Sequence, residues 1–329
     1  MRGERHAGMP STMALPTGEL EIDGHRLTIR NLDRVIFPAT RTTKAEVLDY
    51  YVRVADVMLP HLRDRLLHMH RYPEGVEGPR FWQKACPEHR PPWVATTPVW
   101  SRDKDADIEY CVVEHLATLL WAVNLGSIEL HTSLHLRDDL DRPTTLAFDL
   151  DPGKGVDIVG CARVALELRE LLDGIGLRAL PKTSGSKGLQ VYAPLNGDVS
   201  YAQTKPLARA IAELLEERAP DRVVSRMARA LRPGKVFIDW SQNTQHKSMV
   251  CAYSLRAKAR PTVSTPVRWD EVEAAAASDD PHLLMFDLRD ALERIEEHGD
   301  LFADVLELEQ PLPRVEPPDQ QSLPQMPRT

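Results

Sequence analysis

Two aspartates separated by a single residue, Asp149 and Asp151, lie near the middle of the chain within residues 145–153. On a strand, side chains alternate between the two faces, so both carboxylates are expected on one face. Phe148 and Leu150 would then point into the core. Neighbouring carboxylates repel each other unless a cation lies between them, and oxygen ligands suit Mg²⁺ or Mn²⁺. Taken alone, the pattern also fits an acidic strand end that leads into a turn.

A third aspartate, Asp239, interrupts the apolar residues 236–240. A buried carboxylate is costly without a cation, hydrogen bonds or solvent, and a purely structural role is the alternative. Together with Asp149 and Asp151 it supplies three carboxylates, the usual complement of a two-metal site for phosphoryl transfer. The sequence therefore predicts that these three residues are catalytic and bind two divalent metal ions.

A segment rich in glycine and serine, residues 182–192, could turn backbone N–H groups toward an anion, and Lys187 adds positive charge. Its spacing differs from that of a Walker A loop, and Lys187-Gly188 does not open a helix. An ordinary hairpin loop is the alternative. Basic residues on both sides of Asp239 could line a phosphate channel or form a solvated face. They are Arg226, Arg229, Arg232, Lys235, Lys247, Arg256, Lys258 and Arg260.

Two adjacent aromatic residues, Phe81 and Trp82, lie near Arg71 and Lys84 in the sequence. Large aromatic rings beside basic groups can stack on nucleic-acid bases. Packing in the core is the alternative for side chains of this size.

The composition is that of a globular protein. The chain has 329 residues, of which 42% are hydrophobic, so a real core is expected. The balance of 41 basic and 49 acidic residues gives a net charge of −8. A net acidic chain is not an obvious nucleic-acid binder, so any such binding has to come from local basic surface.

The four cysteines, Cys86, Cys111, Cys161 and Cys251, show no paired spacing. No signal peptide is recognisable, and no apolar run is long enough to span a bilayer. The thiols are therefore expected to be free, in a reducing, cytoplasmic compartment without membrane contact. Cys86 and His89 could begin a zinc site, but no second ligand pair follows at finger-like spacing.

The chain is expected to consist of one domain between two tails. Residues 1–17 lack periodicity, and residues 310–329 are dense in Pro and Gln, so both are expected to be tails. Between them, residues 18–309 alternate between strand and helix patterns, which predicts an α/β or mixed α+β domain. A hairpin with an Asp23-Gly24 turn is expected at residues 19–29. Helices are expected at residues 43–59, 114–125, 156–172, 201–218 and 289–298, and strands at 108–113, 146–149, 179–182, 190–193, 235–240 and 249–254.

Three motifs in this order resemble the polymerase domain of bacterial DNA ligase D, a member of the archaeo-eukaryotic primase superfamily. They are Asp-x-Asp-Pro-Gly at 149–153, Ser-Gly-Ser-Lys-Gly-Leu at 184–189 and Phe-Ile-Asp-Trp-Ser-Gln-Asn at 237–243. The resemblance runs from about residue 20 to about residue 309, and includes residues 31–38, 42–44, 78–84, 128–131 and 252–256. It implies a primase-type core of two packed sheet layers with flanking helices.

The resemblance also implies a function and a set of site residues. A template-dependent primase-polymerase would extend primers or fill gaps at DNA breaks with nucleoside triphosphates, favouring ribonucleotides and Mn²⁺. It would do so in end joining, beside a Ku-like end-binding protein and a separate ligase. Asp149, Asp151 and Asp239 would hold the metal ions. The residues that contact the nucleotide would be His131, Ser184, Lys187, Gln190 and Arg256. Those that bind the DNA 5′-phosphate would be Asn31, Arg34 and Lys44, and those that stack on the template would be Phe81 and Trp82.

The sequence departs from the family pattern at two positions. Gln190 stands where the family usually has His, and a Gln cannot carry a charge. His70 stands where members of the family have Lys, so binding there could depend on pH. Nothing in the chain resembles a ligase or nuclease domain, so a stand-alone relative is expected.

Two other functions compete with this interpretation. A haloacid-dehalogenase-like phosphatase needs Thr or Val two positions after its second Asp, where this chain has Gly153. A catalytically weak module that grasps DNA ends with the same fold is supported only by Gln190, and metal-dependent nucleotide incorporation separates it from a polymerase.

Overall fold

Two β-sheets form the centre of the computed structural model, which describes residues 18–313. The larger sheet has the strand order β13-β14-β12-β16-β15 and the smaller sheet the order β17-β9-β5-β6. The strands of the larger sheet are β12 (Thr145–Pro152), β13 (Leu180–Thr183), β14 (Leu189–Pro194), β15 (Val223–Val224) and β16 (Val236–Asp239). Those of the smaller sheet are β5 (Leu67–Arg71), β6 (Phe81–Gln83), β9 (Ser127–Thr132) and β17 (Met249–Val250).

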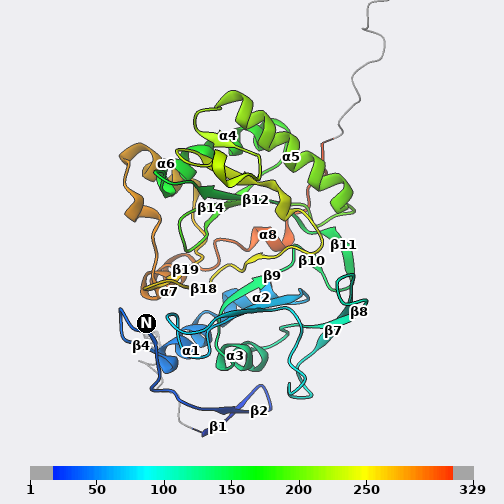
Figure 1. Cartoon of the computed structure of the whole chain (residues 1–329), viewed down its shortest axis with the longest axis vertical. Helices are drawn as coiled ribbons and strands as arrows, with labels where there is room; N and C mark the ends of the chain where they lie inside the picture. Colours follow the sequence, from blue (N-terminus) through cyan, green and yellow to red (C-terminus); the bar gives the residue numbers. More distant parts are fainter. Residues whose placement is uncertain (1–17, 314–329) are drawn as a thin grey trace, which may run out of the picture.

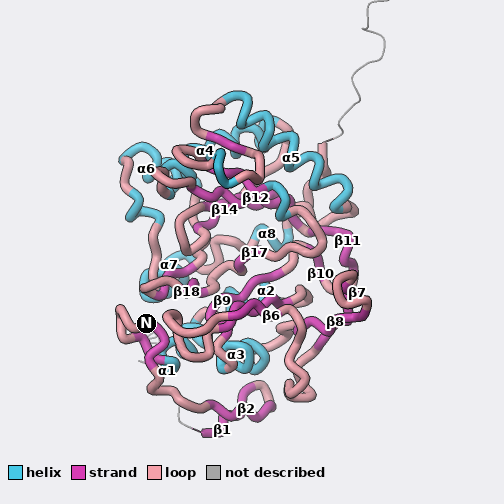
Figure 2. The backbone as a smooth tube through the Cα atoms, in the orientation of Figure 1, coloured by secondary structure: helices cyan, strands magenta, loops and turns pink. Residues whose placement is uncertain are grey.

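Helices cover the outer side of each sheet, which gives the molecule two halves (Figures 1 and 2). The half that contains the larger sheet has α4 (Ile158–Gly174), α5 (Tyr201–Arg218) and α6 (Trp269–Ser278). The half that contains the smaller sheet has α1 (Lys44–Arg53), α2 (Ala55–Leu62) and α3 (Leu116–Asn124), and α7 (Leu288–His298) and α8 (Asp304–Glu307) lie between the halves. Each half has its own hydrophobic cluster. This arrangement confirms the predicted α/β fold with two sheet layers and flanking helices.

Within residues 18–313, five two-stranded hairpins surround the sheets. They are β1 (Gly18–Ile22) with β2 (His25–Ile29), β3 (Val35–Phe37) with β4 (Thr42–Thr43), β7 (Thr96–Ser101) with β8 (Ala106–Cys111), β10 (His135–Leu136) with β11 (Asp139–Pro143), and β18 (Leu255–Ala257) with β19 (Pro261–Val263). The expected Asp23-Gly24 turn is confirmed, with φ values of 52° and 75°. Positive φ at both central residues suits the twist of a tight hairpin.

The expected capping box at the start of α1 is present. The Thr43 side chain accepts a hydrogen bond from the Glu46 backbone, and the Glu46 side chain accepts one from the Thr43 backbone. The helix expected at residues 43–59 is instead two helices, α1 and α2, with Val54 between them. The strand expected at 249–254 ends at Val250, and the chain turns at Tyr253, which has a φ of 66°. The sequence patterns gave no sign of α6, β5 or β9.

The expectation of free thiols is wrong for two of the four cysteines. Cys86 and Cys111 form a disulfide, whereas Cys161 and Cys251 are free and buried. The two partners are 25 residues apart in sequence. They meet because the chain after β6 runs alongside the end of β8. There the Cys86 backbone N–H donates to the Glu109 carbonyl at 2.6 Å. None of the helices in residues 18–313 is both long and apolar enough to cross a bilayer.

Gln310, the first residue of the expected C-terminal tail, is buried against the domain. Its side-chain oxygen accepts a hydrogen bond from the Arg178 backbone, and its amide nitrogen donates to the carbonyls of Arg178 and Pro194. The expected N-terminal tail, residues 1–17, lies outside the described residues. So do residues 314–329 of the expected C-terminal tail.

Two glycines allow the chain to pass very close to its neighbours beside the paired aspartates. A Cβ atom at Gly188 would lie 2.0 Å from the Leu150 carbonyl oxygen, and one at Gly153 would lie 1.8 Å from the Arg232 carbonyl oxygen. Both neighbours are backbone atoms, which cannot rotate away. The loop at residues 184–188 is therefore held against β12, the strand that carries Asp149 and Asp151.

We expect Gly188→Ala to lower the free energy of unfolding by roughly 1–3 kcal/mol, the usual cost of forcing an extra methyl group into a packed site. Gly174→Ala is the matched control, because Gly174 ends α4, where nothing lies within 4 Å of an added Cβ atom. Urea unfolding measures both variants. Equal stability of the two would contradict the close approach at Gly188.

Candidate active site

Asp149 lies on the central strand β12 between two antiparallel neighbours. In register, it is opposite Asp239 of β16 on one side and opposite Gln190 of β14 on the other. Phe148 and Leu150 are fully buried on the helix-covered face, as the alternation predicts. The pairing of β16 with β12 thus places Asp239, the third predicted carboxylate, beside Asp149.

Burial and mutual repulsion oppose the ionisation of the paired aspartates. Burial, followed by the nearby charge of Asp151, raises the pKa of Asp149 to about 7. Burial and the charge of Asp239 also raise the pKa of Asp151, although Arg232 and Arg256 act in the opposite direction. A divalent cation bound between these carboxylates would relieve both effects. The chemistry of Asp149 and Asp151 therefore fits a metal site.

Asp239 is differently engaged. Its Oδ1 accepts hydrogen bonds from the Ser241 backbone at 3.0 Å and from the Ser241 hydroxyl at 2.5 Å, and its Oδ2 accepts one from Gln242 at 2.9 Å. Among the described residues, no three or more His, Cys, Asp or Glu side chains are grouped so as to hold a metal ion. Asp239 has a suitable position for a third ligand, since its Oδ2 accepts only one hydrogen bond and keeps a lone pair for a cation.

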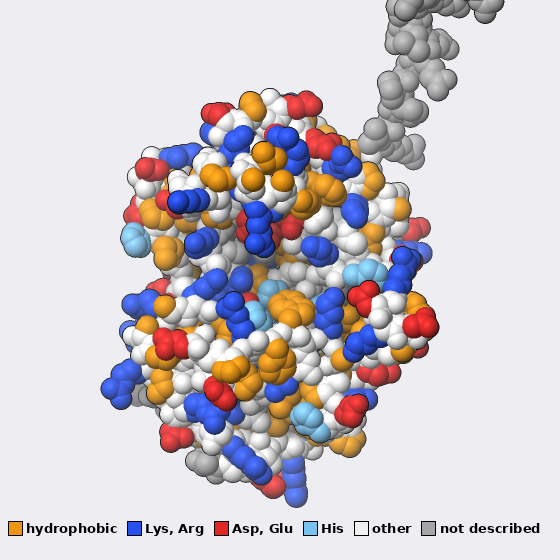
Figure 3. Space-filling model, in the orientation of Figure 1, with side chains coloured by type: hydrophobic (Ala, Val, Ile, Leu, Met, Phe, Trp, Pro, Cys, Tyr) orange, Lys and Arg blue, Asp and Glu red, His pale blue; other side chains and the backbone are white. Residues whose placement is uncertain are grey.

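Asp149 and Asp151, but not Asp239, line a cleft of about 420 Å³ between the two sheets. Figure 3 shows Lys and Arg side chains gathered around the hollow at mid-height of the molecule. Eight of the predicted site residues line this cleft, which are Trp82, His131, Asp149, Asp151, Ser184, Lys187, Gln190 and Arg256. The structure thus brings the expected nucleotide contacts together with two of the expected metal ligands, although they are dispersed over the sequence.

The loop at residues 184–188 is held in place by its own hydrogen bonds. The Ser184 hydroxyl oxygen accepts bonds from the backbone N–H groups of Ser186 and Gly188, and the Ser184 carbonyl accepts one from Arg256 Nη1 at 2.6 Å. Lys187 lines the cleft from the same loop. A fixed loop that carries a lysine beside an arginine is suited to binding an anion.

Glu129 anchors the other wall of the cleft. This buried carboxylate lies 3.2 Å from Arg256 Nε, 3.2 Å from His131 Nε2 and 3.5 Å from His70 Nδ1. Burial opposes its ionisation, but hydrogen bonds from His131 and His70 and the charge of Arg256 outweigh it and hold the pKa of Glu129 below the ordinary value. Burial lowers the pKa of His131 to about 4, so this imidazole is neutral at neutral pH.

Sequence reasoning gave Glu129 no role, although the motif around His131 contains it. It also gave no role to Lys182 or Gln242. The Gln242 Oε1 atom is buried without a hydrogen-bond partner, and so is the Nε atom of Arg232, while both residues line the cleft. Polar atoms of this kind are normally paired.

Asn31, Arg34 and Lys44 line a separate pocket of about 320 Å³. Lys44 Nζ donates hydrogen bonds to the Arg30 carbonyl and to the carbonyl and side-chain oxygens of Asn124. Burial, followed by the charge of Arg34, lowers the pKa of Lys44 to about 8. The three predicted residues thus lie together, although the lysine already has partners.

Two further arginines, Arg30 and Arg71, line the same pocket. His70, which replaces the lysine of the family, is not among its lining residues, since its ring lies 3.2 Å from the Tyr72 hydroxyl and faces Glu129. Arg71 therefore supplies the pocket with positive charge from the same strand.

Phe81 and Trp82 are 44% and 43% exposed, which excludes the alternative that they pack in the core. The Arg71 guanidinium lies 4.9 Å from the centre of the Phe81 ring. Trp82 lies edge-on to His131, with 4.7 Å between the ring centres. Trp82 lines the cationic cleft and Phe81 precedes it on β6, so two exposed aromatic rings are suited to stacking on bases.

Comparison with known proteins agrees with this geometry. The family described as LigD, primase-polymerase domain, matches residues 43–302. The chain is 38% identical over 280 residues to the multifunctional non-homologous end joining protein LigD of Mycolicibacterium smegmatis, covering 84% of this chain and 36% of that protein. It is 31% identical to the bifunctional LigD of Bacillus subtilis, covering 85% of this chain and 44% of that protein. The chain thus spans less than half the length of these relatives.

A solved structure is also similar. The polymerase domain of Mycobacterium tuberculosis ligase D, in complex with DNA, superimposes with a TM-score of 0.78 and 38% identity, covering 85% of this chain and 98% of that one. The two-sheet fold is thus that of the ligase D polymerase domain. The chain belongs to the LigD primase-polymerase domain family.

Glu129→Gln keeps the shape of the side chain and removes the charge that Arg256 faces. We expect it to lower the free energy of unfolding at neutral pH by roughly 1.5–3 kcal/mol, the scale of a hydrogen bond to a charged group. Because the pKa of Glu129 is lowered in the folded state, the difference from wild type should be full above pH 4.5 and should shrink as the pH falls below it. Urea unfolding at several pH values measures it.

The control for this prediction is Glu297→Gln, at a side chain that is 75% exposed. It should leave stability nearly unchanged, since exposed ion pairs contribute little. A Glu129 variant as stable as this control would show that the buried cluster does not depend on its carboxylate.

Proposed function

We propose that this domain is a template-dependent nucleotidyltransferase that extends primers or fills gaps at DNA breaks with ribonucleoside or deoxynucleoside triphosphates. The observation that carries the proposal is that Asp149 and Asp151 line the same cleft as Lys187, Arg232 and Arg256, with Asp239 paired to Asp149 from β16. Carboxylates and cations that line one cleft suit a metal-bound triphosphate.

Asp149 and Asp151 would hold Mg²⁺ or Mn²⁺, and Asp239 would join them when two ions are bound. When bound, the ions supply charge neutralisation at the phosphates and activate a primer hydroxyl. Arg256 would then contact the phosphates, and Glu129 keeps its guanidinium directed into the cleft. Gln242 and Arg232 line the same space.

The DNA would lie across the rim of the cleft. Phe81 and Trp82 offer exposed rings for the template, and the pocket at Asn31, Arg34 and Lys44 would bind a downstream 5′-phosphate. This division suits a break with two DNA ends, since one site holds the reacting end and the other marks the far side of the gap. In end joining, a Ku-like end-binding protein and a ligase would act beside this domain.

Removing both catalytic carboxylates tests the first proposal. Asp149→Ala with Asp151→Ala should abolish nucleotide incorporation in a primer-extension assay with each metal ion and with both kinds of nucleotide. Because these carboxylates oppose each other's ionisation, their loss should not lower the melting temperature. The matched control is Asp139→Ala with Asp141→Ala, which have the same spacing on β11.

The control pair should extend primers at the wild-type rate. Extension by the Asp149 and Asp151 double variant at a comparable rate would contradict two-metal catalysis at this site. A wild-type protein that binds gapped DNA but incorporates no nucleotide would instead support the DNA-end-binding module.

The 5′-phosphate pocket gives a pH-dependent prediction. Wild type should bind a gap with a downstream 5′-phosphate more tightly than one without it, by roughly 1–3 kcal/mol. Since the pKa of Lys44 is about 8, the lysine is charged at pH 7 and loses its proton above pH 8. The preference should therefore decline as the pH rises beyond 8, while the phosphate itself keeps its charge. Fluorescence anisotropy with both gaps between pH 7 and 9.5 measures it.

Lys44→Arg separates charge from structure, because arginine stays protonated throughout this range. It should keep the preference at high pH, whereas Lys44→Ala should lose most of it at every pH. If the wild-type protein does not distinguish the two gaps, this pocket does not recognise a 5′-phosphate. A general primer-extending polymerase would then be the better description.

A further inference from the structure

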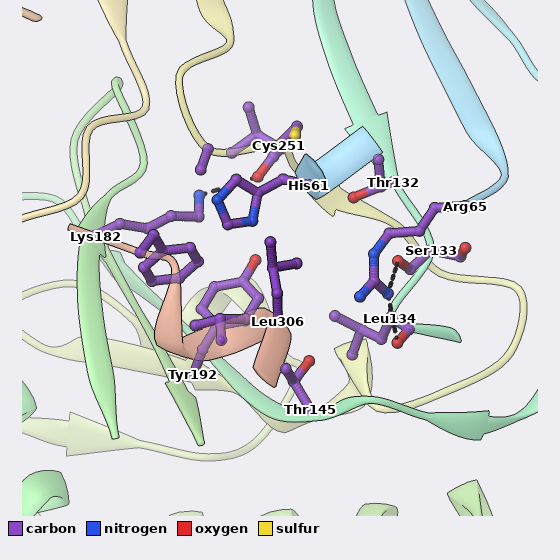
Figure 4. A pocket seen from close by; sticks show the side chains of 14 residues that line it. His61, Arg65, Thr132, Ser133, Leu134, Thr145, Lys182, Tyr192, Cys251 and Leu306 are labelled. Atoms are coloured by element: carbon purple, nitrogen blue, oxygen red, sulfur yellow. Dashed lines mark hydrogen bonds between the residues drawn. The ribbon is translucent and has the colours of Figure 1, made fainter. Parts of the chain in front are cut away.

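A buried lysine lies directly behind the catalytic carboxylates. Lys182 is 1% exposed and extends from β13 into the interior between the two sheets, toward the segment that carries Cys251 (Figure 4). Its Nζ donates to three acceptors, which are Gln190 Oε1 at 2.5 Å, Ser264 Oγ at 2.6 Å and the Val250 carbonyl at 3.0 Å. An ammonium group has three donors and no acceptor, so this set satisfies it completely.

Gln190 connects this lysine with the active site. Its Nε2 donates to Asp149 Oδ1 at 3.0 Å, and the residue is 3% exposed. Both ends of the amide dictate its orientation, because Lys182 requires an acceptor and an ionised Asp149 requires a donor. The reverse orientation would place the amide oxygen against a carboxylate and its N–H groups against an ammonium. The three residues therefore form a chain of hydrogen bonds, here called the relay. All its bonds are donated in one direction, from Lys182 to Gln190 and from Gln190 to Asp149.

We propose that Lys182 is a positioning residue that fixes the sense of the side chain at position 190, so that Asp149 receives an N–H on Oδ1 and keeps Oδ2 free for a divalent cation. In the described chain, the Asp149 Oδ2 atom has no hydrogen-bond partner. The inference rests on the proposed function, since it concerns the metal site of the polymerase.

The relay also accounts for the glutamine at position 190. A neutral imidazole can accept a hydrogen bond at one ring nitrogen and donate one from the other. Next to Lys182, a histidine would thus accept from the lysine and point its N–H toward Asp149, as the glutamine does. Glutamate would present an oxygen to Asp149, and leucine would present nothing. Position 190 therefore requires a neutral group that accepts at one end and donates at the other.

Binding of Mn²⁺ to the purified protein without nucleotide or DNA, followed by electron paramagnetic resonance, tests the relay. Outer groups that orient metal ligands typically change affinity by about 10–100-fold. Lys182→Met should weaken Mn²⁺ binding by about tenfold or more, and so should Gln190→Leu. Gln190→His should stay within about threefold of wild type. In the Gln190→Leu background, Lys182→Met should have no further effect, because the lysine acts only through residue 190.

Ser264→Ala is the matched control, since it removes a different acceptor of Lys182 and leaves the amide contact in place. If Lys182 serves only to join the two sheets, both Lys182→Met and Ser264→Ala will lower the melting temperature, and Mn²⁺ affinity will not distinguish them. Equal Mn²⁺ affinity of wild type and folded Lys182→Met overturns the relay.

Two further outcomes keep the conclusion clear. If Lys182→Met does not fold, the Gln190 series decides, because the relay requires the histidine variant to bind Mn²⁺ clearly more tightly than the leucine variant. Equal affinity of those two overturns it. If the wild-type protein binds no Mn²⁺, the proposed metal-dependent function fails, and the relay fails with it. If the wild type binds Mn²⁺ and the Lys182 variant binds it equally well, only the relay fails.

Discussion

The repulsion among Asp149, Asp151 and Asp239 is the constraint on which the arrangement of this domain depends. Strand alternation and the pairing of β12 with β16 place the three carboxylates at one location, where burial raises the pKa of two of them. Such a site is unfavourable without positive charge nearby. The positive charge comes from elements distant in sequence, so the cleft is lined with cations although the chain as a whole is acidic.

Two buried titratable side chains organise opposite walls of this cleft. Glu129 on β9 gathers Arg256 and two histidines, whereas Lys182 on β13 holds Gln190 and two further acceptors. The partners of Glu129 outweigh the cost of its burial, whereas burial still lowers the pKa of Lys182 to about 7. Lys182 donates across to the Val250 carbonyl of the smaller sheet, and Arg256 donates to the Ser184 carbonyl of the loop after β13. Polar contacts as well as the hydrophobic clusters therefore join the two halves.

Much of the site could be predicted from the sequence because its motifs are local. The alternation around Asp149 and the apolar run around Asp239 each indicate a strand by themselves. Glu129 could not be found in this way, because its partners come from β5 and β18, and short strands of mixed polarity such as Leu67–Arg71 lack a clear periodic pattern. The Cys86–Cys111 disulfide was missed for the same reason, since only the pairing beside β8 brings the cysteines together.

That disulfide has a consequence for how the domain can vary in evolution. It closes a covalent ring that contains the β7–β8 hairpin and joins the ring to the chain next to Phe81 and Trp82. The entropy of closing a loop changes only slowly with its length. Insertions or deletions at the tip of the hairpin would thus leave the point of closure, and with it the aromatic rim of the cleft, where it is. The hairpin is a segment whose length can diverge between relatives while the neighbouring site is retained.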